Sequence, residues 1–223
     1  MDYLPSVAAA AVVLLAVWSA TGYQHHLYRL PEHRVPQPRT VSVVARRAAV
    51  ALLAAAAAAL VFRPDHYGAG PATLTSAAVV VLAVMASTDL ERRLLPNRIM
   101  YPAIVAALAV TWAWPDRSAG ELLLGGVIGL AAGAVLFIGG ELLGALLRVR
   151  ATAFGLGDVK LMALIGLLVG WPAVVSALFL GIIAAGIPAL VMVLVGKGRN
   201  VFAYGPYLIA GAVIVLVFPG AFL

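Results

Sequence analysis

Three acidic residues stand beside long apolar runs of the sequence: Asp89, Glu141 and Asp158. An ionisable group inside a membrane costs about 2.5–3.5 kcal/mol at the centre on insertion scales, so each acid there needs a reason. Asp89 ends one apolar run and Asp158 opens another, at what we predict to be the same depth. Two carboxylates held together away from bulk water share one proton, so one acts as a base while the other acts as an acid.

Such a pair can hydrolyse a peptide bond without a metal or cofactor. The ionised carboxylate takes a proton from water, and the water oxygen attacks the carbonyl carbon of the peptide. The protonated partner hydrogen-bonds the carbonyl oxygen and then supplies a proton to the leaving amine. The pair would titrate as a unit. The same two acids could instead carry protons through a transporter.

Each acid also has a structural interpretation. Asp158 could cap the N-terminus of a helix, and Asp89 could pair with Arg92 or Arg93 at a helix end. Glu141 could be a third polar group at the site, or it could pair with a basic residue such as Arg148, about two turns later. These alternatives remain open at the level of the residues alone.

The composition indicates the elements that must position these acids. The chain is 64% hydrophobic and 11% charged, whereas soluble domains are about 45–50% apolar and 25% charged. We therefore predict an all-α, polytopic membrane protein covered by lipid, with 1–223 as a single transmembrane domain. The net charge of +6 resides in short loops, which argues against nucleic acid as a partner, and the absence of cysteine excludes thiolate metal sites.

Eight apolar runs are predicted to span the membrane, although the sixth is short and Trp171-Pro172 marks its end. The predicted spans are Leu4–Thr21, Val41–Phe62, Ala72–Thr88, Ile99–Trp114, Glu121–Leu147, Val159–Val169, Ala173–Val195 and Phe202–Phe218. Small residues let membrane helices approach closely, so Gly125, Gly129 and Gly133 predict a helix contact. Glu121 suits the N-terminus of the fifth helix.

The basic residues predict the orientation, because they concentrate in alternate loops. Arg63 and Arg117 occupy one set of loops. The other set holds Arg29, Arg34, Arg39, Arg46, Arg47, Arg92, Arg93, Arg98, Arg148, Arg150, Lys160, Lys197 and Arg199. Since positive residues stay on the cytoplasmic side, both termini are predicted to face outward, and Asp89 and Asp158 to lie at the inner face.

Asp89–Asn97, Gly155–Leu161 and Tyr204–Tyr207 are three stretches that carry motifs. Together these motifs resemble the type IV prepilin peptidase family of GxGD intramembrane aspartyl proteases. Asp89-Leu90-Glu91-Arg92-Arg93-Leu94-Leu95-Pro96-Asn97 is similar to the family's Asp-Leu, basic, Leu-Pro-Asn element. Gly155-Leu156-Gly157-Asp158-Val159-Lys160-Leu161 resembles the GxGDxKL signature, and Tyr204-Gly205-Pro206-Tyr207 is similar to a Gly-Pro segment of the last helix.

The resemblance implies that Asp89 and Asp158 are the catalytic pair. It also implies prepilin or pseudopilin substrates with a hydrophobic N-terminal helix, cut at the cytoplasmic face of the cell membrane without a cofactor.

Neighbouring residues are expected to shape the site. Gly155 and Gly157 permit unusual backbone conformations and a close substrate strand. Lys160 either neutralises the site or extends to the interface as a structural lysine. Pro96 and Pro206 are predicted to punctuate helices, and Asn97 is expected to be the N-cap of the fourth span.

The chain departs from longer relatives in its first inner loop, about 22–40. Many of them carry a cysteine-rich insert there that is associated with N-methylation, and this loop has no cysteine and is too short for one. We therefore expect a short, peptidase-only form. His25, His26 and His33 are interpreted as surface-loop residues rather than metal ligands.

Two competing functions remain beside the protease. A proton-coupled transporter would use the same acids, but no internal repeat is visible and the acids sit at the interface rather than at the midplane. An inactive scaffold for pilus or secretion assembly is the other alternative, although both aspartates and their motifs are intact.

Overall fold

The computed structural model describes residues 3–64, 66–114, 117–146, 154–194 and 203–222, and across these ranges it contains helices and no strands. The predicted all-α class is therefore confirmed. The chain divides into two compact units: Met1–Pro102 with Ala113–Pro115, and Ala103–Trp112 with Asp116–Leu223.

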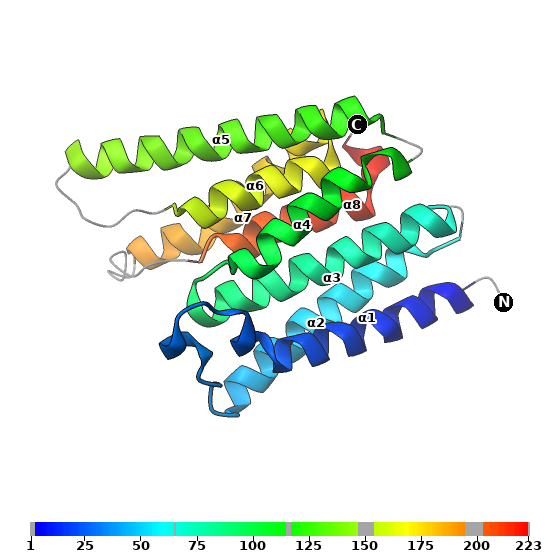
Figure 1. The fold of residues 1–223 in the computed structure, drawn as a ribbon, viewed down its shortest axis with the longest axis horizontal. Helices are drawn as coiled ribbons and strands as arrows, with labels where there is room; N and C mark the ends of the chain where they lie inside the picture. The colour runs from blue at the N-terminus through cyan, green and yellow to red at the C-terminus, as the bar shows by residue number, and fades with distance from the viewer. Residues whose placement is uncertain (1–2, 65, 115–116, 147–153, 195–202, 223) are drawn as a thin grey trace. The chain divides into compact units, whose positions relative to one another are not determined.

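The first unit is built on α1 (Leu4–Gly22), α2 (Val41–Val61) and α3 (Ala69–Arg92), which pack against one another (Figure 1). The Ser6 hydroxyl donates to the Phe62 carbonyl at 2.6 Å and ties the start of α1 to the end of α2. The Thr40 side chain accepts the Val43 N–H at 3.4 Å and caps α2. Between α1 and α2 lie two short 3₁₀ turns, η1 (Gln24–Leu27) and η2 (Pro31–Arg34).

Helix α4 (Asn97–Ala109) spans the division between the units and is followed by η3 (Thr111–Ala113). The Pro96 carbonyl accepts the N–H groups of Ile99 and Met100 at 3.0 Å each, so the helix starts directly after Pro96. Asn97 is its first residue, and the prediction that Asn97 is the N-cap was wrong by one position. The predicted role of Pro96 at a helix boundary is confirmed.

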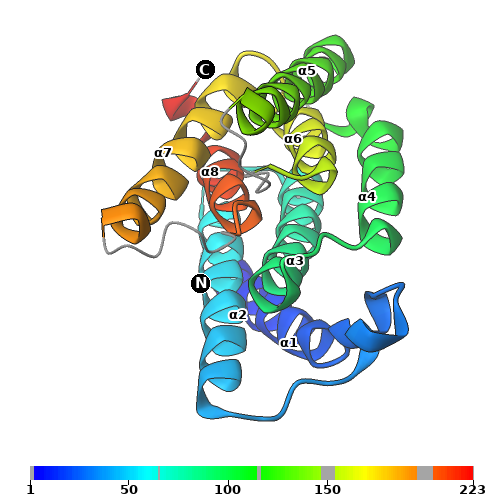
Figure 2. The same ribbon diagram turned by 90° about the vertical axis from the view of Figure 1, so that its left-hand side faces the viewer.

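The second unit contains α5 (Ala119–Leu146), α6 (Leu156–Val169), α7 (Ala173–Leu194), α8 (Gly205–Val217) and the short η4 (Pro219–Ala221). Helix α5 lies along α6, and α7 lies along α8 (Figure 2). The Ser118 N–H donates to the Glu121 carboxylate at 2.7 Å, and the Glu121 N–H donates to the Ser118 hydroxyl at 3.2 Å. This reciprocal cap confirms that Glu121 belongs at the start of the fifth helix.

The α5–α6 contact is a glycine seam, formed by Gly125, Gly129 and Gly133 of α5 against α6. A Cβ atom on Gly133 would lie 2.9 Å from the Cα of Val159, and one on Gly129 would overlap the Met162 backbone. The two backbones can approach this closely only because these positions carry no side chain. The predicted packing role of these glycines is confirmed.

Four described helices are long and apolar enough to cross a membrane: α1, α2, α3 and α5. Shorter apolar helices cover Ala173–Pro188 and Gly205–Val217. Each predicted span contains a helix, but the boundaries differ, since α3 continues to Arg92 and α4 stops at Ala109. The predicted ends at Leu147, Val195 and Phe202 lie outside the described residues. The number of spans and the placement of the termini stay predictions.

Candidate functional site

Asp89 lies in the last turn of α3 rather than after it. The helix continues to Arg92, and Arg93 adopts a left-handed conformation (φ 55°) whose N–H donates to the Asp89 carbonyl at 2.8 Å. The Asp89 side chain is 5% exposed. The chain therefore ends this helix abruptly, one turn after a buried carboxyl group.

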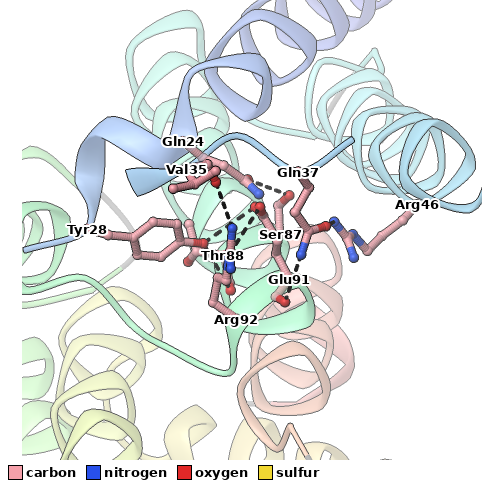
Figure 3. A network of polar contacts seen from close by, with 9 residues as sticks. All are labelled: Gln24, Tyr28, Val35, Gln37, Arg46, Ser87, Thr88, Glu91 and Arg92. Atoms are coloured by element: carbon pink, nitrogen blue, oxygen red, sulfur yellow. Dashed lines mark hydrogen bonds and ion pairs between the residues drawn. The ribbon is translucent and has the colours of Figure 1, made fainter. Parts of the chain in front are cut away.

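The loop between α1 and α2 is fastened to this end of α3 by a network of polar contacts, which we call the loop clamp (Figure 3). Its members are Gln24, Tyr28, Val35, Gln37, Ser87, Thr88, Glu91 and Arg92. At its centre the Ser87 hydroxyl donates to the Gln24 side-chain carbonyl at 2.7 Å, and both residues are buried. Ser87 is two residues before Asp89, so the loop holds the turn that carries the carboxyl group.

Tyr28 reaches the same turn from the loop. Its hydroxyl lies 3.4 Å from the Glu91 carboxylate and 3.5 Å from the Thr88 carbonyl, both as acceptors. Burial, reinforced by the nearby Glu91 charge, raises the pKa of Tyr28 well above its ordinary value. The hydroxyl therefore remains a proton donor at any physiological pH.

Glu91 and Arg92 complete the clamp. Arg92 donates to the Val35 carbonyl at 2.7 Å and lies 3.7 Å from the Glu91 carboxylate, while the Gln37 amide donates to the Glu91 carbonyl at 3.5 Å. Arg92 thus directs its guanidinium toward Glu91 and the loop. The alternative in which Asp89 pairs with Arg92 or Arg93 stays a prediction.

Asp158 is positioned by local structure in the second unit. Helix α6 begins at Leu156 with Gly155 as its N-cap, and Asp158 is its third residue. The Asp158 carboxylate accepts the Gly155 N–H at 2.9 Å. The N-cap interpretation was therefore wrong in position, although the carboxylate does satisfy a backbone N–H at the helix start.

The two glycines beside Asp158 do not use glycine-only conformations. Gly155 has φ −101° and ψ 161°, an extended conformation open to any residue, and Gly157 lies inside the helix. Gly170 is the glycine with positive φ in the described ranges. The expectation of unusual backbone at Gly155 and Gly157 was wrong, and close approach of a substrate strand stays a prediction.

The segment before α6 meets the start of α8. The rings of Phe154 and Tyr204 lie 5.5 Å apart at 50°. The residue directly before the Gly155–Leu161 stretch therefore contacts the first residue of the Tyr204–Tyr207 stretch. Pro206 falls in the first turn of α8, as predicted. Lys160 is half-buried in α6, whereas Glu141 is exposed on α5 and Arg148, its suggested partner, lies outside the described residues.

Asp89 lies in the first unit and Asp158 in the second, so their pairing remains a prediction from the sequence. Among the described residues, no three His, Cys, Asp or Glu side chains form a group suited to a metal ion. The loop clamp was not predicted from the sequence. Its signal was present in the sequence: Gln24 and Tyr28 follow one apolar run within seven residues, and Ser87-Thr88 ends another.

A multi-pass helical membrane protein with an aspartate at each of two helix ends defines a narrow class, and comparison with known proteins identifies its family. Residues 76–190, just over half of the chain, match the profile of the type IV leader peptidase family. The chain belongs to this family, and the matched range contains both aspartates.

Two curated relatives are similar to the chain. They are the prepilin leader peptidase/N-methyltransferase proteins of Burkholderia pseudomallei strains 1026b and K96243, each 31% identical over 151 residues. The matched residues are 67% of this chain and 47% of each relative, so the chain spans about half the length of these proteins. No solved structure matches it.

Proposed function

We propose that the protein is a membrane-embedded aspartyl endopeptidase that removes the leader peptide of type IV prepilins or related pseudopilins. The observation that carries this proposal is membership of the type IV leader peptidase family over a range that includes Asp89 and Asp158. The relatives' names describe prepilin leader peptidases, and the substrate class is carried over from them.

In the proposed reaction, Asp89 and Asp158 act together on one water molecule. The ionised member of the pair removes a proton from the water, whose oxygen attacks the carbonyl carbon of the scissile peptide. The protonated member hydrogen-bonds the carbonyl oxygen, and the pair then delivers a proton to the leaving amine. The loop clamp supports this role because it fixes the helix turn that carries Asp89.

The proposed arrangement in the membrane has eight spans, both termini outside and both aspartates at the cytoplasmic face of the cell membrane. The long apolar helices support it, as does the concentration of basic residues in alternate loops. The absence of cysteine makes a direct test simple. A single cysteine at Glu32 should react with a membrane-impermeant maleimide only in inside-out vesicles, and one at Ser118 only in right-side-out vesicles. Labelling of both from one side would overturn the arrangement.

A short inner loop also supports a peptidase-only form, without the N-methyltransferase activity in the relatives' names. The competing functions are a proton-coupled transporter that uses the same aspartates and an inactive assembly scaffold. Both predict that no prepilin is cut, so one assay separates them from the protease.

The assay is cleavage of a panel of prepilins and pseudopilins by the purified full chain in detergent. Asp89→Asn and Asp158→Asn keep the side-chain shape but remove the ionisable group, so each should lower the rate by at least about 10²–10⁴-fold, the usual share of general acid–base catalysis. Glu32→Gln, in the exposed loop, is the matched control and should cut like the parent. Failure of the parent to cut any substrate, or full activity in both variants, would refute the protease.

A further inference from the structure

A pocket of about 470 Å³ lies in the first unit where the end of α1, the start of α2 and the intervening loop meet. It is separate from the proposed reaction, because neither aspartate lines it. Its chemistry is unusual for the edge of an apolar helix pair, since three arginines contribute to its wall: Arg39, Arg46 and Arg47.

The pocket carries an excess of positive charge. Glu91 is the acidic residue among its lining groups, and that carboxylate already accepts from the Tyr28 hydroxyl and lies 3.7 Å from Arg92 outside the lining. Burial and the neighbouring His26 lower the pKa of His25, although Glu91 opposes them, so His25 is less protonated than an ordinary histidine. Three arginines therefore line the pocket together with one carboxylate, and that carboxylate has a basic partner of its own.

One of these arginines, Arg46, has a buried N–H donor without a hydrogen-bond acceptor among the described residues. Arg46 donates from Nη2 to the Gln37 side chain at 3.1 Å, but its Nε is buried and finds no acceptor among the described residues. A buried donor without a partner costs about 1–3 kcal/mol, so an oxygen ligand at this position would be stabilising. Guanidinium groups bind phosphate oxygens in a two-point, charge-assisted manner.

Part of the wall is apolar, which suits a lipid rather than a small soluble anion. Trp18, Val43 and Val44 line the pocket, and they come from two of the helices that are apolar enough to cross a membrane. Arg47 lies 4.7 Å over the Trp18 ring and donates to the Trp18 carbonyl at 2.9 Å. Tryptophan and arginine side by side are typical of the interface where headgroups lie.

We propose that this pocket binds the headgroup phosphate of an anionic phospholipid, with Arg39, Arg46 and Arg47 around the phosphate and Trp18 and Val44 beside the acyl chain. Basic pockets at the cytoplasmic ends of membrane helices recognise anionic headgroups in this way. The proposal rests on the membrane location of the chain and is independent of whether the protein cuts prepilins.

The experiment measures lipid retained by the purified full chain after incubation with mixed micelles of phosphatidylglycerol and phosphatidylcholine, using native mass spectrometry. The parent should retain more phosphatidylglycerol than phosphatidylcholine. Arg46→Gln and Arg39→Gln should each weaken this retention about fivefold, the contribution of one basic residue near an anionic surface. Arg39 is exposed, so its variant reports on the pocket even if loss of the Arg46–Gln37 contact disturbs the loop.

The matched control is Arg29→Gln, which removes an equal charge from the same loop but outside the pocket lining. It should retain lipid like the parent. Equal loss in all three variants, or no preference for phosphatidylglycerol in the parent, would overturn the proposal. Displacement of the lipid by a few millimolar inorganic phosphate would also overturn it, because the pocket would then be a site for free anions.

Discussion

The two candidate catalytic residues are held in different ways. The Asp89 turn of α3 is fixed by polar side chains that reach it from a distant loop, with a buried 2.7 Å bond between Ser87 and Gln24. The α6 helix that carries Asp158 is fixed by backbone contact with the α5 glycine seam, and its carboxylate bonds only one turn back, to Gly155. One region depends on hydrogen bonds and the other on the absence of side chains.

This difference has a physical basis. In lipid there is little hydrophobic gain from packing two apolar helices, so close backbone approach supplies the contact between α5 and α6. At the end of α3 the apolar run is over, and polar side chains there can exchange hydrogen bonds to water for hydrogen bonds within the protein. A loop can therefore hold this end of the helix through side-chain hydrogen bonds. The seam should therefore be sensitive to added volume and the clamp to lost polar atoms.

The largest effect is expected in the seam. Gly129→Ala should lower the free energy of unfolding by about 1–3 kcal/mol or more, because its Cβ would overlap the Met162 backbone and backbone cannot rotate away. Thermal unfolding in detergent measures the loss. Cleavage should fall as well, since α6 must move and Asp158 with it.

Gly140→Ala is the matched control in the same helix. Nothing lies within 4 Å of a Cβ at that position, and alanine favours a helix over glycine by about 1 kcal/mol. The control should be as stable as the parent or slightly more so. If both variants unfold at the same temperature, close packing is not what holds α6.

The seam and the clamp also differ in how far the sequence could predict them. The four-residue spacing of Gly125, Gly129 and Gly133 indicated a helix contact from local periodicity alone, although not that α6 is the partner. Apolar runs likewise predicted where each helix lies. The helix ends were predicted less well: α3 continues one turn beyond its apolar run, and this turn includes Asp89.

The clamp could not be predicted in the same way, because its partners are separated by 63 residues in the cases of Gln24–Ser87 and Tyr28–Glu91. No local pattern specifies such pairs. The position of Asp158 illustrates a smaller failure. The N-cap interpretation placed the helix start at Val159, but the helix starts three residues earlier, at Leu156, and Asp158 accepts a backbone N–H from inside the first turn.

An intermediate effect is expected at the centre of the clamp. Ser87→Ala leaves the buried Gln24 carbonyl without its hydroxyl partner, which should cost about 1–3 kcal/mol. Gln24→Ala should cost a similar amount. If the two residues act through one bond, the double variant should be less destabilised than the sum of the single variants, by about 0.5–3 kcal/mol.

Thr73→Ala is the control on the same helix, because its hydroxyl donates only to the Ala69 carbonyl one turn back and is exposed. It should leave stability and cleavage nearly unchanged. Additive losses in the Ser87 and Gln24 variants would show that the loop does not hold α3 through this pair, and the contrast with the seam would then disappear.

The smallest effect at neutral pH is expected from Tyr28→Phe, which removes one hydroxyl and keeps the ring. The lost bond to Glu91 should cost about 0.5–1.5 kcal/mol. Because burial raises the pKa of Tyr28 in the folded protein, the parent's advantage should be complete below the unfolded tyrosine pKa of about 10. Above that pH only the unfolded chain releases the phenolic proton, so the advantage should decline as pH rises.

Chemical unfolding of the parent and the Phe variant at about pH 8 and about pH 11 tests this sign, because the other titrating groups change equally in both proteins. The difference in free energy of unfolding between the parent and Tyr28→Phe should be smaller at the higher pH. Tyr3→Phe, on an exposed residue, should show no gap at either pH. A Tyr28 gap that stays constant or widens would mean that this hydroxyl is not buried against Glu91. The clamp would then rest on the bonds of Gln24, Gln37 and Arg92.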